Sequence, residues 1–216
     1  MRNSQEISNQ LANVGIVPVV RLSNQTQAIP LAKALIKGGM PVAEITLRTR
    51  CAVSCIEAIK DKYPEILIGA GTVLTVSQAE DAVLAGAKFI VCPGLVTDVI
   101  KWCITKNIPV YPGVCTPTEI CTALALGLHE LKFFPASDFG GLKTIKSLLS
   151  VFNDISVMPT GGITIDNCKD YLQTPGVLCC GGTFVAPLPL IEEGAFNEIQ
   201  RIVERTVACV AEVNMR

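Results

Sequence analysis

Residues 17–46 read VPVVRLSNQTQAIPLAKALIKGGMPVAEIT, and they contain two short apolar runs separated by a helical pattern. The runs VPVV (17–20) and VAEIT (42–46) are rich in β-branched residues, which is typical of buried strands. Between them, residues 25–37 place apolar side chains on one helical face, namely Ala28, Leu31, Ala32, Leu35 and Ile36. This order predicts a strand, a crossover helix and a parallel strand.

The same pattern recurs along the chain, with a further helix predicted at 77–85. The other strand candidates are ILIGA (66–70), FIVCP (89–93), IPVYP (108–112), LKFFP (131–135), ISVMP (155–159) and GVLCC (176–180). Successive starts lie 19 to 25 residues apart, the length of one strand, one helix and two short loops. Eight such units favour a closed (β/α)₈ TIM barrel over an open doubly wound sheet.

The barrel accounts for the whole chain, so we expect a single domain over residues 1–216 without a linker. A short N-terminal helix is predicted at 4–13 and a closing helix at 196–213. We expect no chemistry from either helix.

Composition argues against several classes of partner. Half of the 216 residues are hydrophobic and the net charge is −1, which gives a large core but no basic field for nucleic acid or an anionic membrane. The first ten residues are polar and include Glu6, unlike a secretory signal. Residues 171–191 carry no charge, but prolines and glycines interrupt them repeatedly. We therefore expect a soluble, cytoplasmic protein.

The ten cysteines form no CxxC pair, and most lie in apolar runs. This pattern indicates small buried hydrophobes in a reducing compartment. With one histidine, His129, the chain offers neither a His₃ zinc site nor an HExxH helix, so no metal site is predicted. We expect His129 to be an ordinary loop or strand-end residue and Trp102 to be a helix-packing residue.

Lys132 is the sharpest functional candidate, because it lies inside the apolar run of a predicted strand. Removal from water favours the neutral form of a lysine amine, and the neutral amine is the nucleophile that condenses with a ketone. The alternative is an edge lysine whose ammonium group reaches solvent. Because barrel active sites lie at the carboxyl ends of the strands, the barrel context favours the first interpretation.

Glu44, Thr46 and Arg48 alternate along the predicted second strand and its extension, so they share the face that points into the barrel. A carboxylate and a guanidinium in one cavity suit proton transfer beside capture of a substrate carboxylate. A structural ion pair between Glu44 and Arg48 is an equally open interpretation.

Three glycine-containing stretches follow predicted strands, namely GAGTV (69–73), TGGI (160–163) and GGTF (181–184). Glycine lets backbone N–H groups approach an anion closely. Each stretch alone indicates only a tight turn. The last two stand after strands seven and eight, where barrels often bind phosphate, and Thr183 adds a hydroxyl donor.

Together these residues resemble the 2-keto-3-deoxy-6-phosphogluconate (KDPG) aldolase family, which also resembles enzymes that cleave 4-hydroxy-2-oxoglutarate (KHG). The resemblance runs in order over almost the whole chain, through EITLRT (44–49), GAGTV (69–73), PGL (93–95), ELKFFPA (130–136), PTGGI (159–163) and GGTF (181–184). It implies a class I aldolase without a cofactor or metal, commonly a homotrimer.

The resemblance also implies roles for individual residues. Lys132 would form the Schiff base with C2 of the substrate, and Glu44 would move protons. The remaining residues would bind substrate: Arg48 and Thr72 its carboxylate, Pro93 and Phe134 the pocket walls, and Gly161, Gly162 and Thr183 the 6-phosphate. Family members that act on the gluconate compound usually have serine at the position of Thr183, which leaves preference for its C4 epimer from galactonate open.

Two other functions use the same residues differently. A phosphosugar isomerase would use the glycine loops with Glu44 as a base and form no Schiff base. A non-catalytic phosphosugar-binding barrel would need the glycine loops alone.

Overall fold

The computed structural model describes residues 2–214. Its strands are β1 (Ile16–Val20), β2 (Val42–Thr46), β3 (Leu67–Gly71), β4 (Phe89–Val91), β5 (Val110–Tyr111), β6 (Gly113–Val114), β7 (Glu130–Phe133), β8 (Ser156–Pro159) and β9 (Cys180–Gly182). Its helices are α1 (Arg2–Val14), α2 (Ala28–Lys37), α3 (Ala52–Lys62), α4 (Val76–Ala85), α5 (Thr97–Lys106), α6 (Pro117–Ala125), α7 (Gly141–Leu149), α8 (Cys168–Leu172), α9 (Leu188–Glu192) and α10 (Phe196–Asn214), with 3₁₀ turns η1 (Gln25–Gln27) and η2 (Thr183–Val185).

The strands form a closed ring of parallel neighbours. One sheet has the order β5-β4-β3-β2-β1-β9 and the other the order β6-β7-β8. Thr160, directly after β8, bridges to Gly181 of β9, and only Pro112 separates β5 from β6. Since β5 pairs with β4 and β6 with β7, these two short segments together occupy one position of the ring. The predicted (β/α)₈ barrel is confirmed.

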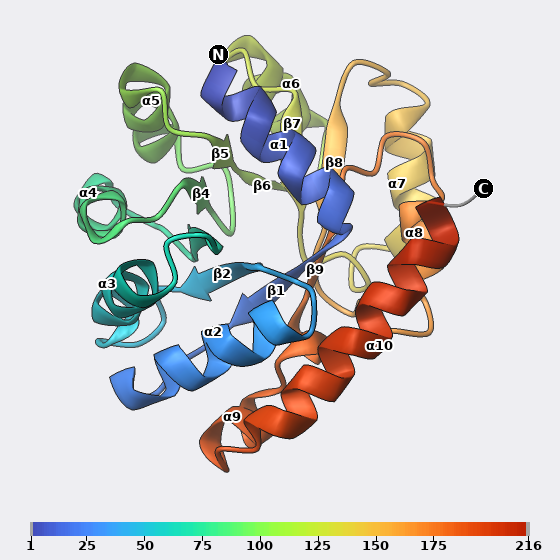
Figure 1. Ribbon diagram of the computed structural model, residues 1–216. Coiled ribbons are helices and arrows are strands. Elements are labelled where there is room, and N and C mark those ends of the chain that lie inside the picture. Colours follow the sequence, from blue (N-terminus) through green and yellow to red (C-terminus); the bar gives the residue numbers. More distant parts are fainter. Residues whose placement is uncertain (1, 215–216) are drawn as a thin grey trace.

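The helices surround this ring (Figure 1). Helices α2 to α5 pack against one another in chain order, and α10 packs against α2. The buried face of α2 consists of Ala28, Leu31, Ala32, Ala34 and Leu35, which includes four of the five residues predicted from the periodicity. A capping box in which Thr75 accepts from the backbone N–H of Gln78 begins α4, and left-handed Gly86 ends it.

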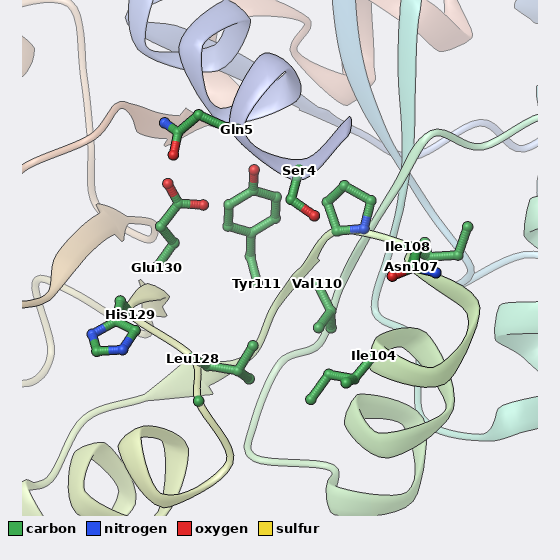
Figure 2. A pocket seen from close by; sticks show the side chains of 12 residues that line it. Ser4, Gln5, Ile104, Asn107, Ile108, Val110, Tyr111, Leu128, His129 and Glu130 are labelled. Atoms are coloured by element: carbon green, nitrogen blue, oxygen red, sulfur yellow. The ribbon is translucent and has the colours of Figure 1, made fainter. Parts of the chain in front are cut away.

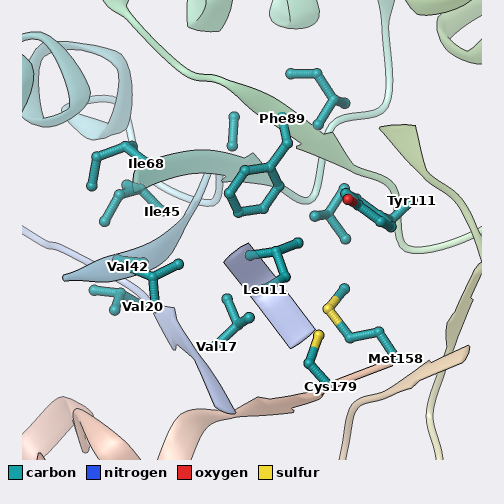
Figure 3. Packing of buried hydrophobic residues seen from close by; sticks show 14 of the residues in the cluster. Leu11, Val17, Val20, Val42, Ile45, Ile68, Phe89, Tyr111, Met158 and Cys179 are labelled. Carbon is teal, nitrogen blue, oxygen red and sulfur yellow. The ribbon is translucent and has the colours of Figure 1, made fainter. Parts of the chain in front are cut away.

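Helix α1 precedes β1 directly and covers the amino-terminal end of the barrel. Its Leu11 is fully buried, and Figure 3 shows it among Val17, Phe89 and Tyr111 of the barrel. The predicted short N-terminal helix is therefore confirmed. Helix α1 therefore closes the amino-terminal end of the barrel and does not cover the carboxyl end, where the residues after each strand lie.

Gly69 has a packing role in the barrel interior. A Cβ atom at this position would lie 2.1 Å from the ring of Phe89, which makes an edge-to-face contact with Tyr111 at a centroid distance of 5.9 Å. The first glycine of GAGTV therefore makes room for an aromatic ring and is a strand residue rather than part of a loop.

Two strand predictions were wrong in detail. GVLCC overlaps β9 only at Cys180, because Gly176 is left-handed (φ +88°) and the Val177 N–H closes a turn on Thr174. Gly181 and Gly182 consequently lie in the strand, not in the predicted loop. IPVYP contains only the two residues of β5, because Pro112 has no N–H for the ladder, and the strand resumes as β6 at Gly113, beyond the predicted run. The other strands lie at their predicted places within two residues, and VAEIT is β2 without change.

Within residues 2–214, none of the helices combines the length and apolar character needed to cross a bilayer. The cysteines in this part of the chain are all unpaired thiols. No three side chains among His, Cys, Asp and Glu of these residues come together as a metal-binding group.

Candidate active site

Lys132 and Glu44 form a buried ion pair inside the barrel. Strand β7 supplies Lys132 and β2 supplies Glu44, and the two residues are 5% and 0% exposed. The Nζ atom of Lys132 lies 3.3 Å from Oε1 of Glu44. Lys132 therefore does not reach solvent, and Glu44 pairs with Lys132 rather than with Arg48. Both structural alternatives left open by the sequence are wrong.

Glu44 has room for this position only because residue 71 is glycine. A Cβ atom on Gly71 would lie 2.0 Å from Oε1 of Glu44. The second carboxylate oxygen, Oε2, is buried, and no group in the described part of the chain donates a hydrogen bond to it. Glu44 can thus hold the amine with one oxygen and accept a proton with the other.

Phe134 and Cys92 surround the amine. The Nζ atom of Lys132 lies 5.4 Å from the centroid of the Phe134 ring, within range of a cation–π interaction. Burial, the neighbouring Cys103 and the Glu44 carboxylate together raise the pKa of the Cys92 thiol to about 12, although the charge of Lys132 lowers it. Cys92 therefore remains a protonated thiol near neutral pH. No sequence pattern singled out Cys92, which lies in the apolar run of residues 89–93.

Arg48 lies just beyond the carboxyl end of β2 and is exposed. Its Nε atom donates to the Thr46 hydroxyl at 3.2 Å, and that hydroxyl donates to the Val20 carbonyl on β1 at 2.8 Å. The Arg48 guanidinium is therefore held at Thr46, which lies two residues beyond Glu44 on the same face of β2. The predicted face of Glu44, Thr46 and Arg48 is present.

Thr72 and Pro93 follow the next two strands. Thr72 comes directly after β3 with φ +58°, a left-handed conformation that strains a β-branched residue. Such strain is most frequent at functional sites. Pro93, two residues after β4, is half-buried. Both residues occupy the carboxyl ends of their strands, as predicted.

The glycine pair after β8 forms a tight loop. Gly161 and Gly162 have φ values of +99° and +73°, and a Cβ atom on Gly162 would lie 2.1 Å from the Ser137 hydroxyl. The Ser137 N–H donates to the Gly161 carbonyl at 3.1 Å, and Asn167 Nδ2 donates to the Gly162 carbonyl at 2.9 Å. Ser137 and Asn167 thus shape this loop, although their sequence positions did not single them out.

Thr183 begins η2 directly after β9 and is exposed. The bridge between Thr160 and Gly181 holds the ends of β8 and β9 side by side. The Gly161–Gly162 loop and Thr183 therefore lie at one carboxyl edge of the ring, where an anion can meet backbone N–H groups and a hydroxyl together.

A different cavity, of about 440 Å³, lies at the opposite end of the barrel. Figure 2 shows Ser4 and Gln5 of α1 beside Tyr111 and Glu130 at the amino-terminal side of the strands. His129 also lines it, and its ring nitrogen Nδ1 lies 3.1 Å from the Asp154 carbonyl. Trp102 donates to Glu80 across α5 and α4. These contacts agree with the structural roles expected for His129 and Trp102.

Comparison with known proteins identifies the family. The model of the KDPG and KHG aldolase family matches residues 7–202. The chain is 42% identical over 204 residues to the 2-dehydro-3-deoxy-phosphogluconate aldolase of Haemophilus influenzae, covering 94% of this chain and 96% of that one. It is 38% identical to the KHG/KDPG aldolase of Escherichia coli K12 over 208 residues, with coverage of 96% and 98%.

A solved structure agrees in fold. KDPG aldolase from Legionella pneumophila, determined with pyruvate captured as a covalent carbinolamine intermediate, superposes with a TM-score of 0.89. It is 36% identical, and the match covers 92% of this chain and 97% of that one. The chain therefore belongs to the KDPG and KHG aldolase family.

Proposed function

We propose that the protein is a class I aldolase that cleaves 2-dehydro-3-deoxy-6-phosphogluconate to pyruvate and glyceraldehyde 3-phosphate. The buried contact between Lys132 and Glu44 at 3.3 Å carries this proposal, because it combines an amine nucleophile with a proton acceptor inside the barrel. The carbinolamine captured in the Legionella relative is the first covalent intermediate of such a reaction.

The reaction begins when the Lys132 ammonium passes a proton to the Glu44 carboxylate 3.3 Å away and the resulting amine attacks the C2 ketone, which forms a carbinolamine. Glu44 then gives that proton to the departing hydroxyl and becomes a carboxylate again. Loss of water gives a cationic Schiff base, which draws the C3–C4 bonding electrons toward nitrogen. Glu44, through a bound water, takes the C4 hydroxyl proton as glyceraldehyde 3-phosphate leaves. The same carboxyl returns a proton to C3 of the enamine, and hydrolysis releases pyruvate and regenerates the amine.

The substrate's two anionic ends would lie on different strands. Arg48 and Thr72, after β2 and β3, bind the carboxylate, and Pro93 and Phe134 form the pocket walls between the ends. The backbone around Gly161 and Gly162, with the Thr183 hydroxyl, binds the 6-phosphate after β8 and β9. Cleavage of 4-hydroxy-2-oxoglutarate to pyruvate and glyoxylate uses the same amine and carboxylate subsite without the phosphate loop.

A coupled assay for pyruvate release tests the reaction and the substrate together. Lactate dehydrogenase and NADH would report pyruvate from three substrates: the gluconate phosphate, its galactonate C4 epimer, and 4-hydroxy-2-oxoglutarate. We expect the highest kcat/KM for the gluconate phosphate. A higher value for the galactonate epimer would favour the alternative substrate. Failure to release pyruvate from all three would overturn the aldolase and favour the isomerase or the non-catalytic binding barrel.

We further propose a cytoplasmic homotrimer. The unpaired thiols of the described cysteines suit a reducing compartment. Phe139, in the loop before α7, and Val151, two residues after its end, are 46% and 72% exposed, and a subunit contact would cover such side chains. Sedimentation equilibrium should give three times the chain mass, and a monomer mass at micromolar protein would contradict the trimer.

A further inference from the structure

We propose that Thr46 is a positioning residue that fixes the Arg48 guanidinium for the substrate carboxylate, an inference that rests on the proposed aldolase function. Thr46 is the last residue of β2 and is only 1% exposed. It touches no reacting atom in the proposed mechanism, so its effect on the reaction passes through Arg48.

The direction of each hydrogen bond follows from what the groups can donate. The Thr46 hydroxyl has one proton, and it donates that proton to the Val20 carbonyl at 2.8 Å. Its lone pairs then face the Arg48 Nε–H, which donates at 3.2 Å. Because a guanidinium can only donate and a carbonyl can only accept, the three groups form a chain with a single polarity.

Fixing Nε determines which part of Arg48 meets the substrate. An exposed arginine side chain samples many rotamers, and ordering it on binding costs conformational entropy. The Thr46 contact pays part of that cost in advance. With Nε occupied, the two terminal nitrogens, Nη1 and Nη2, remain for a bidentate contact with a carboxylate.

The contact also couples Arg48 to the catalytic pair. Thr46 and Glu44 are neighbours on one face of β2, and β2 pairs with β1 so that Val19 is opposite Glu44 and Val20 opposite Ile45. The hydrogen bond from the Thr46 hydroxyl to the Val20 carbonyl therefore joins the end of β2 to β1, the strand that pairs with β2 at Glu44. Arg48 and Glu44 receive their positions from one rigid segment.

The chain contains a matched control. Thr49 donates its hydroxyl to the Leu22 carbonyl at 2.7 Å and so joins the segments after the same two strands. Among the described residues, neither the Thr49 hydroxyl nor the Leu22 carbonyl forms a hydrogen bond with the Arg48 side chain. Thr49→Val removes a threonine-to-carbonyl bond between these segments without removing the support of the guanidinium.

The test measures the aldol addition of pyruvate to glyceraldehyde 3-phosphate, varying each substrate in turn. In Thr46→Val the KM for pyruvate should rise about tenfold, the scale of one hydrogen bond to a charged group. The KM for glyceraldehyde 3-phosphate should stay within about twofold, because that substrate has no carboxylate, and kcat should change by less than about threefold. Thr46→Ser should restore the pyruvate KM, and Thr49→Val should leave both KM values unchanged.

Two further variants keep the test decisive. Thr46→Ala removes the hydroxyl without the added methyl of valine, should the valine variant not fold. In an Arg48→Lys background, which has no Nε, removing the Thr46 hydroxyl should not raise the pyruvate KM further.

Different results overturn different claims. If the wild-type protein catalyses the addition but Thr46→Val and Thr46→Ala keep its pyruvate KM, the positioning role is wrong and the aldolase stands. Equal increases in both KM values, or the same increase in Thr49→Val, would also overturn the positioning role. If the wild-type protein catalyses no addition, the aldolase function is wrong and the inference fails with it.

Discussion

The Nζ atom of Lys132 lies 3.3 Å from Oε1 of Glu44, although 88 positions separate the two residues in the chain. Both side chains are buried, so water screens their interaction weakly. The barrel brings them together because β7 and β2 project them into one interior. The pair therefore serves two ends: each charge compensates the burial of the other, and together they place a nucleophile beside a proton acceptor.

Removing only the lysine should destabilise the fold. In Lys132→Met the Glu44 carboxylate is left buried without its partner, and we expect the free energy of unfolding to fall by about 3 kcal/mol. In the double variant Lys132→Met/Glu44→Met the unpaired charge is also gone, and at least half of that loss should be recovered. Urea unfolding at pH 7 and a fixed protein concentration measures both changes.

Activity should not follow stability in this series. Both variants lack the amine and should be inactive in the pyruvate-release assay. A single variant that is as stable as the wild type, with a double variant that is less stable, would show that the two charges are not coupled.

Gly71→Ala should damage catalysis through Glu44. The new Cβ atom would lie 2.0 Å from Oε1 and 2.6 Å from Cδ of Glu44, so the carboxylate has to leave its place beside Lys132. We expect kcat to fall by on the order of 100-fold, the usual contribution of a positioned general acid–base. Steady-state kinetics on the gluconate phosphate measures this.

Gly94→Ala is the control for this change. A Cβ atom at Gly94 would meet nothing within 4 Å, and its backbone is not left-handed. The control should fold with wild-type stability. A Gly71→Ala variant with wild-type kcat would mean that Glu44 does not need its observed position.

The pH dependence of stability should include a contribution from Glu119, at the start of α6. Partial burial raises the pKa of this carboxyl, but hydrogen bonds from the Cys115 backbone N–H and from the hydroxyl and N–H of Thr116 outweigh burial. The net effect holds the pKa below its ordinary value of 4.5. Because folding lowers this pKa, the stabilisation is complete above pH 4.5 and is lost as the pH falls through the folded pKa.

Glu119→Gln isolates that contribution. At pH 7 the variant should be less stable than the wild type by about 1 kcal/mol, and the difference should shrink as the pH falls below 4.5. Denaturant unfolding of both proteins from pH 7 to pH 3 measures the difference. A constant difference over that range would show that the charge of Glu119 does not stabilise the start of α6.

Much of the fold was predictable because local pattern and global architecture agree. The run 42–46 alternates and is β-branched, and it forms β2 without change. The same alternation placed Glu44, Thr46 and Arg48 on one face before any contact was known. Lys132 stood out because an ammonium group inside an apolar run needs a partner.

The remaining features depend on contacts between distant segments. Val177 to Cys179 have strand-like composition, but after the turn at Gly176 they form only an isolated bridge from Val177 to Val157, and the continuous strand β9 contains two glycines. Residue 71 has to be glycine because the side chain of Glu44, which belongs to another strand, occupies the place of a Cβ atom. No local pattern reveals such a requirement, and the partner of Lys132 was equally undefined until β2 and β7 were placed.

The Schiff base on Lys132 is tested most directly by trapping it. The protein would be incubated with pyruvate and sodium borohydride, and the adduct located by mass spectrometry of the intact chain and its peptides. One reduced pyruvate should be found per wild-type chain, on Lys132. The control variant Lys143→Met, which removes an exposed lysine of α7, should carry the same adduct. Lys132→Met should carry none. An unmodified wild-type chain, or an equal adduct in Lys132→Met, would contradict the proposed mechanism.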